Sequence, residues 1–213
     1  MNGSMAVHPM IRPALIAPAM ALAALLSPFA AAPARAPAIR PMTCAVPVKK
    51  GDTAASLKQR YGAQARLMKI HAAEGEMVDG MALWPNDPAR RIDVFFADAP
   101  GKRVETIRIA EAHSAWRIGG LGIGSRLDAV VKANGRPVRV GGFGWDYGGG
   151  VDERGGKLAH WPGGCRIGLV MDVGPEVRDP PDNVFGDGVS MGSNSQALQA
   201  ARPRVVKIFV SWP

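Results

Sequence analysis

The sequence predicts an α+β fold made of two tandem units, each a short helix packed on a three- to four-stranded antiparallel sheet. An internal repeat is the first observation: "GDTAASLKQRYG", from Gly51 to Gly62, returns 73 residues later as "GSRLDAVVKANG", from Gly124 to Gly135. The second observation is that the segments following each copy match in type and order. We therefore expect a first unit over residues 37–110 and a second over residues 111–213.

Each copy of the twelve-residue repeat predicts one short helix. A glycine is followed by a residue able to cap a helix, Asp52 or Ser125. Leu57 and Val130 take matching positions on the apolar face, and each copy ends at a glycine, a residue typical of helix ends.

The segments after each helix predict strands. "RIDVFFA" follows Trp84 as "RIGLVMD" follows Trp161, and "RVETIRI" from Arg103 matches "RVVKIFV" from Arg204. Their alternating or β-branched residues are typical of strands. Three or four such strands covered by a helix can hold a core. We expect Trp84 and Trp161, each followed by proline, to anchor the packing of their units.

This layout resembles the tandem helix-plus-sheet units of the beta-lactamase inhibitory protein family and the single unit of SmpA/OmlA-type envelope lipoproteins. The resemblance runs from about Val46 to Trp212 and depends on the helix-start glycines and the strand order. It implies an exported, non-catalytic module that binds a protein.

The first 36 residues predict an export signal. They contain Arg12 and no acid, then an apolar stretch over residues 14–32 and the small-residue run "APARAPA". The apolar stretch is interrupted by proline and is shorter than the roughly 20 residues of a membrane-spanning helix. We therefore expect cleavage near Ala34, Ala36 or Ala38, no lasting membrane anchor, and a periplasmic or secreted protein.

Two cysteines and the net charge bear on the environment and the partner. An oxidising compartment favours a disulfide between Cys44 and Cys165, with two separate buried thiols as the alternative. The formal net charge is +8, with the basic residues scattered along the chain. The scattered basic residues and the predicted export signal argue against a nucleic-acid partner. An exported protein or an anionic cell-envelope polymer is the expected partner, unless the charge serves solubility alone.

The segment "GFGWDYGGG", residues 142–150, is the candidate binding site. The repeat places residues 145–147 opposite residues 72–74, where the first copy has two alanines and Glu74. In an extended strand, alternate rings would share one face. That face would either pack the core, with glycines allowing close approach, or present rings to a protein or sugar. The expected binding residues are Phe143, Trp145, Asp146 and Tyr147.

An insertion over residues 174–203 separates the last two strands of the second unit. Its length indicates a functional or disordered loop, and "SNSQALQAAR" predicts a short helix near its end. The insertion contains "GVSMG", the letters of a nucleophile elbow. A serine hydrolase is not expected, because polar loop precedes this segment and no histidine follows His160.

Other catalytic chemistry has weaker support. The alternative function is a small envelope glycan hydrolase that uses Asp146 with Asp152 or Glu153 as paired carboxylates. A structural envelope protein whose duplication serves assembly is a third possibility. The histidines lack the spacing of metal ligands, so no metal and no cofactor is expected.

Overall fold

The structure is a computed structural model that describes Met1, residues 38–97 and residues 102–213. Apart from Met1, the expected export signal over residues 1–36 lies outside these described residues. Within them, no helix combines the length and the apolar character that a membrane crossing requires.

Six antiparallel strands form the main sheet in the order β2-β3-β4-β5-β11-β9. They are β2 (Ala65–His71), β3 (Met77–Leu83), β4 (Ile92–Phe96), β5 (Val104–Ile109), β9 (Arg166–Asp172) and β11 (Arg204–Ser211). The α+β prediction is confirmed, whereas the predicted sheet size of three to four strands is wrong. Strand β5 pairs with β11, because either strand left at an edge would expose unpaired backbone groups.

Two smaller sheets complete the strand pairing. Strands β10 (Ser190–Gly192), β7 (Arg139–Gly141) and β8 (Val151–Asp152) form an antiparallel sheet in that order. Strands β1 (Arg40–Met42) and β6 (Trp116–Ile118) pair in parallel. A single bridge between Gly150 and Val170 connects the start of β8 to β9, so the small sheet lies beside the edge of the main one.

Helices α1 (Ala54–Tyr61) and α2 (Leu127–Asn134) end at the predicted glycines, Gly62 and Gly135, but begin differently from the expectation. Thr53, not Asp52, caps α1 through a reciprocal pair of hydrogen bonds with Ser56. Arg126, not Ser125, is the N-cap residue before α2, and its side chain makes no capping hydrogen bond. The reason is that Asp52 and Ser125 bind elsewhere: Asp52 accepts hydrogen bonds from Arg60, and the Ser125 hydroxyl accepts one from the Gly122 N–H.

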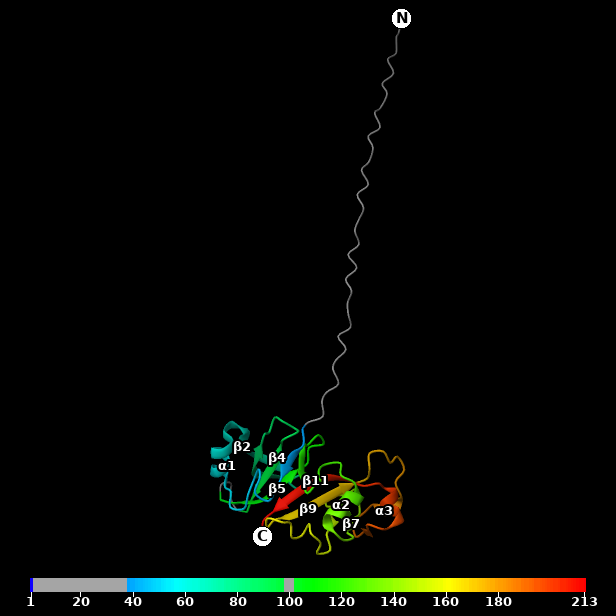
Figure 1. Cartoon of the computed structure of the whole chain (residues 1–213). Helices are drawn as coiled ribbons and strands as arrows, with labels where there is room; N and C mark the ends of the chain where they lie inside the picture. Colours follow the sequence, from blue (N-terminus) through cyan, green and yellow to red (C-terminus); the bar gives the residue numbers. More distant parts are fainter. Residues whose placement is uncertain (2–37, 98–101) are drawn as a thin grey trace. The chain divides into compact units, whose positions relative to one another are not determined.

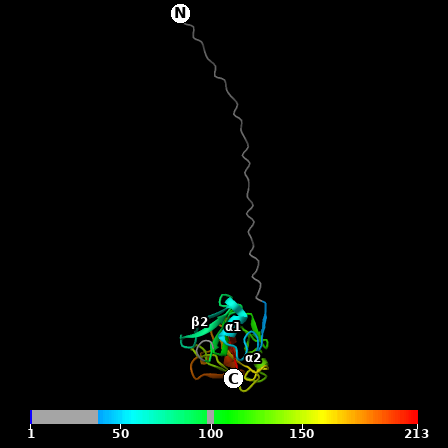
Figure 2. The same ribbon diagram turned by 90° about the vertical axis from the view of Figure 1, so that its left-hand side faces the viewer.

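The core lies between one face of the sheet and the helices. Five buried side chains stand opposite one another across five strands: Met81, Val94, Ile107, Val210 and Ile167. Leu57 of α1 and Val130 of α2 are fully buried in the same cluster. Figure 1 shows α1 beside β2 and α2 near β9 and β7, and Figure 2 shows the same body from its α1 end.

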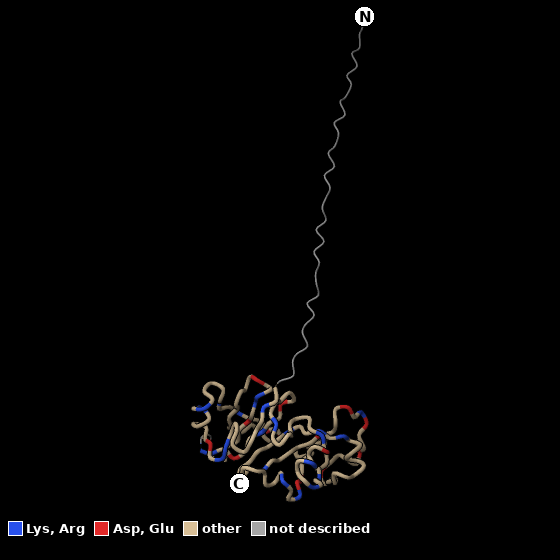
Figure 3. Tube along the Cα trace, viewed as in Figure 1, with Lys and Arg blue, Asp and Glu red and all other residues tan. Residues whose placement is uncertain are grey.

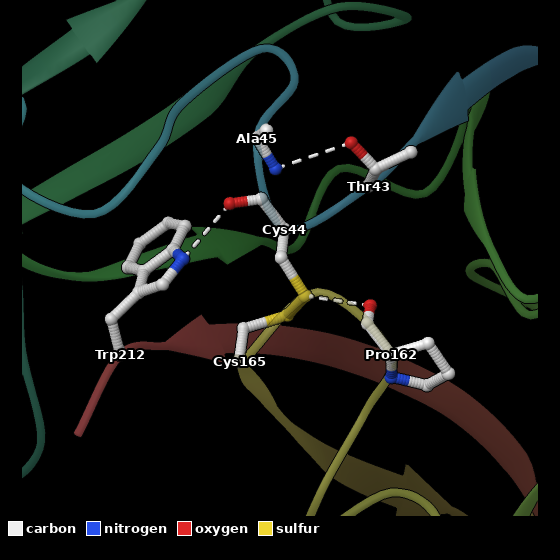
Figure 4. The surroundings of a disulfide bond; sticks show 6 residues. All are labelled: Thr43, Cys44, Ala45, Pro162, Cys165 and Trp212. Carbon is white, nitrogen blue, oxygen red and sulfur yellow. Dashed lines mark hydrogen bonds between the residues drawn. A yellow bond between two sulfur atoms is a disulfide. The ribbon is translucent and has the colours of Figure 1, made fainter.

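A disulfide between Cys44 and Cys165 ties the segment after β1 to the residue before β9 (Figure 4), in agreement with the cysteine count. The indole N–H of Trp212 donates to the Cys44 carbonyl oxygen at 2.9 Å. Cys44 Sγ lies 3.3 Å from the carbonyl oxygen of Pro162; a disulfide sulfur carries no proton, so this is a contact and not a hydrogen bond. Both cysteines are buried, which makes the bridge part of the core.

The insertion over residues 174–203 is folded. It forms a 3₁₀ turn, η2 (Asp182–Val184), strand β10 and helix α3 (Gln196–Ala200). Helix α3 lies in the segment predicted to be helical, and Ser195 is its N-cap. Leu198 is fully buried in the core. Ser190 of "GVSMG" lies on β10, where its hydroxyl accepts a hydrogen bond from Arg139 Nε.

Candidate functional site

The aromatic segment forms a closed loop between β7 and β8 and not the expected extended strand. The Gly142 carbonyl accepts from the Gly149 N–H and from the Trp145 indole N–H, both at 3.0 Å. The Gly148 N–H donates to the Trp145 carbonyl at 2.9 Å. Gly144 has a φ of +82°, which reverses the chain and breaks the alternation of side chains that a strand would give. The rings therefore do not share one face.

Glycines in this loop are needed for close backbone approach. A Cβ on Gly149 would lie 1.8 Å from the carbonyl oxygen of Met171 on β9. A Cβ on Gly142 would lie 2.3 Å from the carbonyl oxygen of Gly186 in the insertion. The loop is thus held between β9 and the insertion at distances that admit no side chain.

Phe143 belongs to the core. Its side chain is 1% exposed, and its backbone pairs with the insertion through the Val184 carbonyl and the Gly186 N–H. Its ring meets the edge of Phe185 at a centroid distance of 6.5 Å. The packing interpretation therefore holds for Phe143, and a fully buried ring offers no surface to a partner. Phe185 itself is exposed beside Gly144, and nothing in its local sequence indicated this.

Trp145 and Tyr147 are exposed and pack against each other. Their relative exposures are 39% and 56%, and their ring centroids lie 5.7 Å apart with an edge-on tilt of 60°. The Tyr147 hydroxyl donates to Glu74 Oε1 at 2.9 Å. Glu74 lies in the turn between β2 and β3 and precedes Tyr147 by 73 residues, the spacing of the repeat. The loop therefore contacts the matching turn of the other half of the chain.

An ion pair on the main sheet helps to hold the β2–β3 turn in place. Arg108 and Asp93 stand opposite each other on β5 and β4, on the sheet face away from the helices, and their side chains pair at 2.7 Å. Arg108 Nη1 also donates to the His71 carbonyl at 2.7 Å, at the end of β2. The Arg108–Asp93 pair is nearly buried, so this hydrogen bond holds the β2–β3 turn over the sheet next to Tyr147.

Carboxylates surround the Tyr147 phenol. Its pKa is raised above the ordinary value, first by the hydrogen bond to Glu74, then by desolvation and by the charges of Glu74, Asp146 and Glu76. Tyr147 is therefore a neutral donor at neutral pH. Within the described part of the chain, none of these three carboxylates forms an ion pair. Three carboxylates thus lie near the Tyr147 phenol, although the chain as a whole is basic and its charges are scattered (Figure 3).

A cavity of about 400 Å³ opens beside the indole of Trp145. Its charged lining residues are Asp146, Asp172 at the end of β9 and Lys207 of β11, and the sequence did not single out the last two. Asp152 and Glu153 are not among its lining residues. Glu153 is buried and paired with Arg166 at 2.5 Å, and Asp152 accepts the Arg154 backbone N–H. The carboxylates expected for glycan hydrolysis are therefore not gathered at this cavity.

Across the described ranges, no group of three or more histidine, cysteine or acidic side chains is placed to hold a metal ion. Comparison with protein-family models, with curated proteins and with solved structures finds no match to this chain.

Proposed function

We propose that this protein is an exported binding module that recognises a protein partner through Trp145 and Tyr147. The observation that carries the proposal is a pair of exposed, mutually packed rings held to the β2–β3 turn by the Tyr147–Glu74 hydrogen bond. Exposed aromatic side chains with one polar end are enriched in protein interfaces. A loop closed by its own hydrogen bonds also loses little conformational entropy on binding.

The site draws on both halves of the chain, which we take to be tandem units. Support comes from the order of elements: α1, β2, β3, β4 and β5 in the first half correspond to α2, β7, β8, β9 and β11 in the second. The halves pair along β5 and β11. Residues 142–149 and the β2–β3 turn, which correspond in the repeat, would then form one recognition surface.

Charge favours a protein partner over an anionic polymer. Glu74, Glu76 and Asp146 lie around Tyr147, and the adjacent cavity adds Asp172 and one cation, Lys207. An anionic polymer would meet like charges here, whereas lysine or arginine side chains would find carboxylates and an indole face. The proposed partner is therefore an exported protein that presents basic side chains. The disulfide supports the exported location.

The test is affinity capture from a periplasmic or secreted protein extract, followed by a binding isotherm with the purified partner. A Trp145→Ala, Tyr147→Ala variant should lose the partner, and a Glu74→Gln, Asp146→Asn variant should weaken it and reduce its salt dependence. The matched control is Ile39→Ala, Val46→Ala, which removes two exposed apolar side chains elsewhere. Equal binding by all folded variants would contradict the proposal.

A further inference from the structure

A second cavity lies away from the aromatic loop. Its volume is about 630 Å³, and it is bounded by helix α2 and by the insertion around α3. Four apolar side chains line it: Leu127, Val131, Pro137 and Pro203. Ser193, Asn194 and Gln199 add neutral polar groups. This volume falls within the range of roughly 300 to 1,000 Å³ typical of sites for small organic ligands.

The charged residues of this cavity are mostly cations. Arg126, Lys132 and Arg202 line it, and Asp128 is its one acidic lining residue. Arg126 Nε lies 3.4 Å from Asp128 Oδ1, so the opposite charges of these two side chains offset each other. Among the described residues, neither Lys132 nor Arg202 has an acidic partner within ion-pair distance. Two positive charges therefore stand beside an apolar floor, and Glu176, which is paired with Arg204 at 2.6 Å, interacts with Arg202 at longer range.

The backbone at Arg202 places one of these cations under constraint. Arg202 has a φ of +45°, a conformation that non-glycine residues adopt rarely. The peptide group that precedes it is held by two hydrogen bonds: the Arg202 N–H donates to the Gln199 carbonyl, and the Ala201 carbonyl accepts from the Gly174 N–H. Backbone outliers of this kind concentrate at functional sites.

We propose that this cavity binds one alkyl chain and the head group of an amphiphilic anion. The alkyl chain would lie over Leu127, Val131 and Pro203, and its carboxylate or phosphate head group would sit between Lys132 and Arg202. Burial of the chain supplies affinity, and the two cations select an anionic head over a neutral or positive one. This site is independent of the proposed protein recognition, because neither Trp145 nor Tyr147 lines it.

The experiment is calorimetric titration of the whole protein with monomeric decanoate, with decanol, decyltrimethylammonium and acetate as comparison ligands. Decanoate should bind at least about tenfold more tightly than each of the others. A Lys132→Glu, Arg202→Glu variant should weaken decanoate binding about tenfold and leave decanol unchanged. Lys58→Glu, Arg103→Glu is the matched control, because it reverses two exposed cations outside the cavity and should bind decanoate like the wild type.

A second variant, Val131→Trp, fills the floor and should reduce decanoate binding while circular dichroism shows the native fold. Flotation with phosphatidylglycerol vesicles separates the two sources of such an anion. Vesicle binding lost in the Lys132→Glu, Arg202→Glu variant assigns a membrane lipid, and binding of monomeric decanoate alone assigns a free amphiphile. No binding of either probe, equal affinity for decanol and decanoate, or an unchanged affinity in the charge-reversed variant overturns the proposal.

Discussion

Removal of the Cys44–Cys165 disulfide should lower the free energy of unfolding by about 5 kcal/mol. The bridge joins residues separated by 121 positions. In the chain-entropy model, a closed loop of that length restricts the unfolded chain by about 16 cal/mol/K, which is about 5 kcal/mol at room temperature. The total stability of a domain of this size is of order 5–15 kcal/mol, so the change should remove a large part of it.

The variant is Cys44→Ala, Cys165→Ala, and the assay is urea unfolding followed by tryptophan fluorescence. Wild-type protein reduced with dithiothreitol is the control, and it should unfold at nearly the same urea concentration as the variant. Part of any loss of unfolding free energy comes from lost packing, because both cysteines are buried. A loss below about 1 kcal/mol would refute the entropic reasoning, since the loop length alone requires several times that amount.

Three further predictions concern single side chains. Gly149→Ala should cost about 3 kcal/mol in urea unfolding, because its φ is +72° and the added Cβ would lie 1.8 Å from a carbonyl oxygen. Asp52→Asn should cost about 2 kcal/mol at neutral pH, because it weakens a buried, charge-assisted pair of hydrogen bonds to Arg60. In a Tyr61→Phe background, phenolate absorbance should give Tyr147 a pKa above the ordinary value of about 10, and Glu74→Gln should lower it.

The Gly149→Ala prediction has a matched control variant. Gly51→Ala shares the positive φ, at +80°, but meets no atom within 4 Å, so it should cost only about 1 kcal/mol. Equal losses for Gly51→Ala and Gly149→Ala would show that the close approach of the loop to β9 is not rigid. A Tyr147 pKa unaffected by Glu74→Gln would remove the link between the loop and the β2–β3 turn.

The Asp52 prediction also has a definite pH dependence. Burial alone would raise the pKa of Asp52, but hydrogen bonds from Arg60, the Lys49 N–H and Ser56, with the charge of Arg60, keep it below the ordinary value. The stabilisation is therefore fully present above the unfolded pKa of about 3.9 and is lost as the pH falls through the folded value. The stability difference between wild type and Asp52→Asn should shrink below about pH 4. A difference that is constant with pH would contradict this assignment.

The parts of the fold that could be predicted from the sequence depend on local signals. The ends of α1 and α2 at Gly62 and Gly135 follow from the conformations that glycine tolerates. Strand pairing across long sequence distances could not be predicted, and the union of β5 with β11 in one sheet is the clearest case. The alternation of residues 143–147 was misleading because it assumed extended backbone at Gly144, where φ is positive.

Only part of the candidate site could be predicted from the sequence, again because contacts between distant residues are not a local signal. The rings of Trp145 and Tyr147 stand out as a departure from the repeat, which is a feature of the sequence. Their partner Glu74 occupies the matching position in the first copy, but an alignment pairs positions by similarity and says nothing of contact. The local charge was also hidden, since a net charge of +8 gives no sign of the carboxylates gathered around Tyr147.

The insertion over residues 174–203 explains why the rings can be both exposed and fixed. Two of its carbonyl groups accept hydrogen bonds from the aromatic loop. The Phe143 N–H donates to the Val184 carbonyl at 2.9 Å, and the Gly142 N–H donates to the Val189 carbonyl at 2.8 Å. These bonds anchor the start of the aromatic loop, while the approach of Gly149 to β9 anchors its end. A loop held at both ends needs no burial of Trp145 or Tyr147 to keep its shape, so their apolar surface stays available to a partner. The same insertion contributes lining residues to the cationic cavity at α2, so one segment borders both proposed sites.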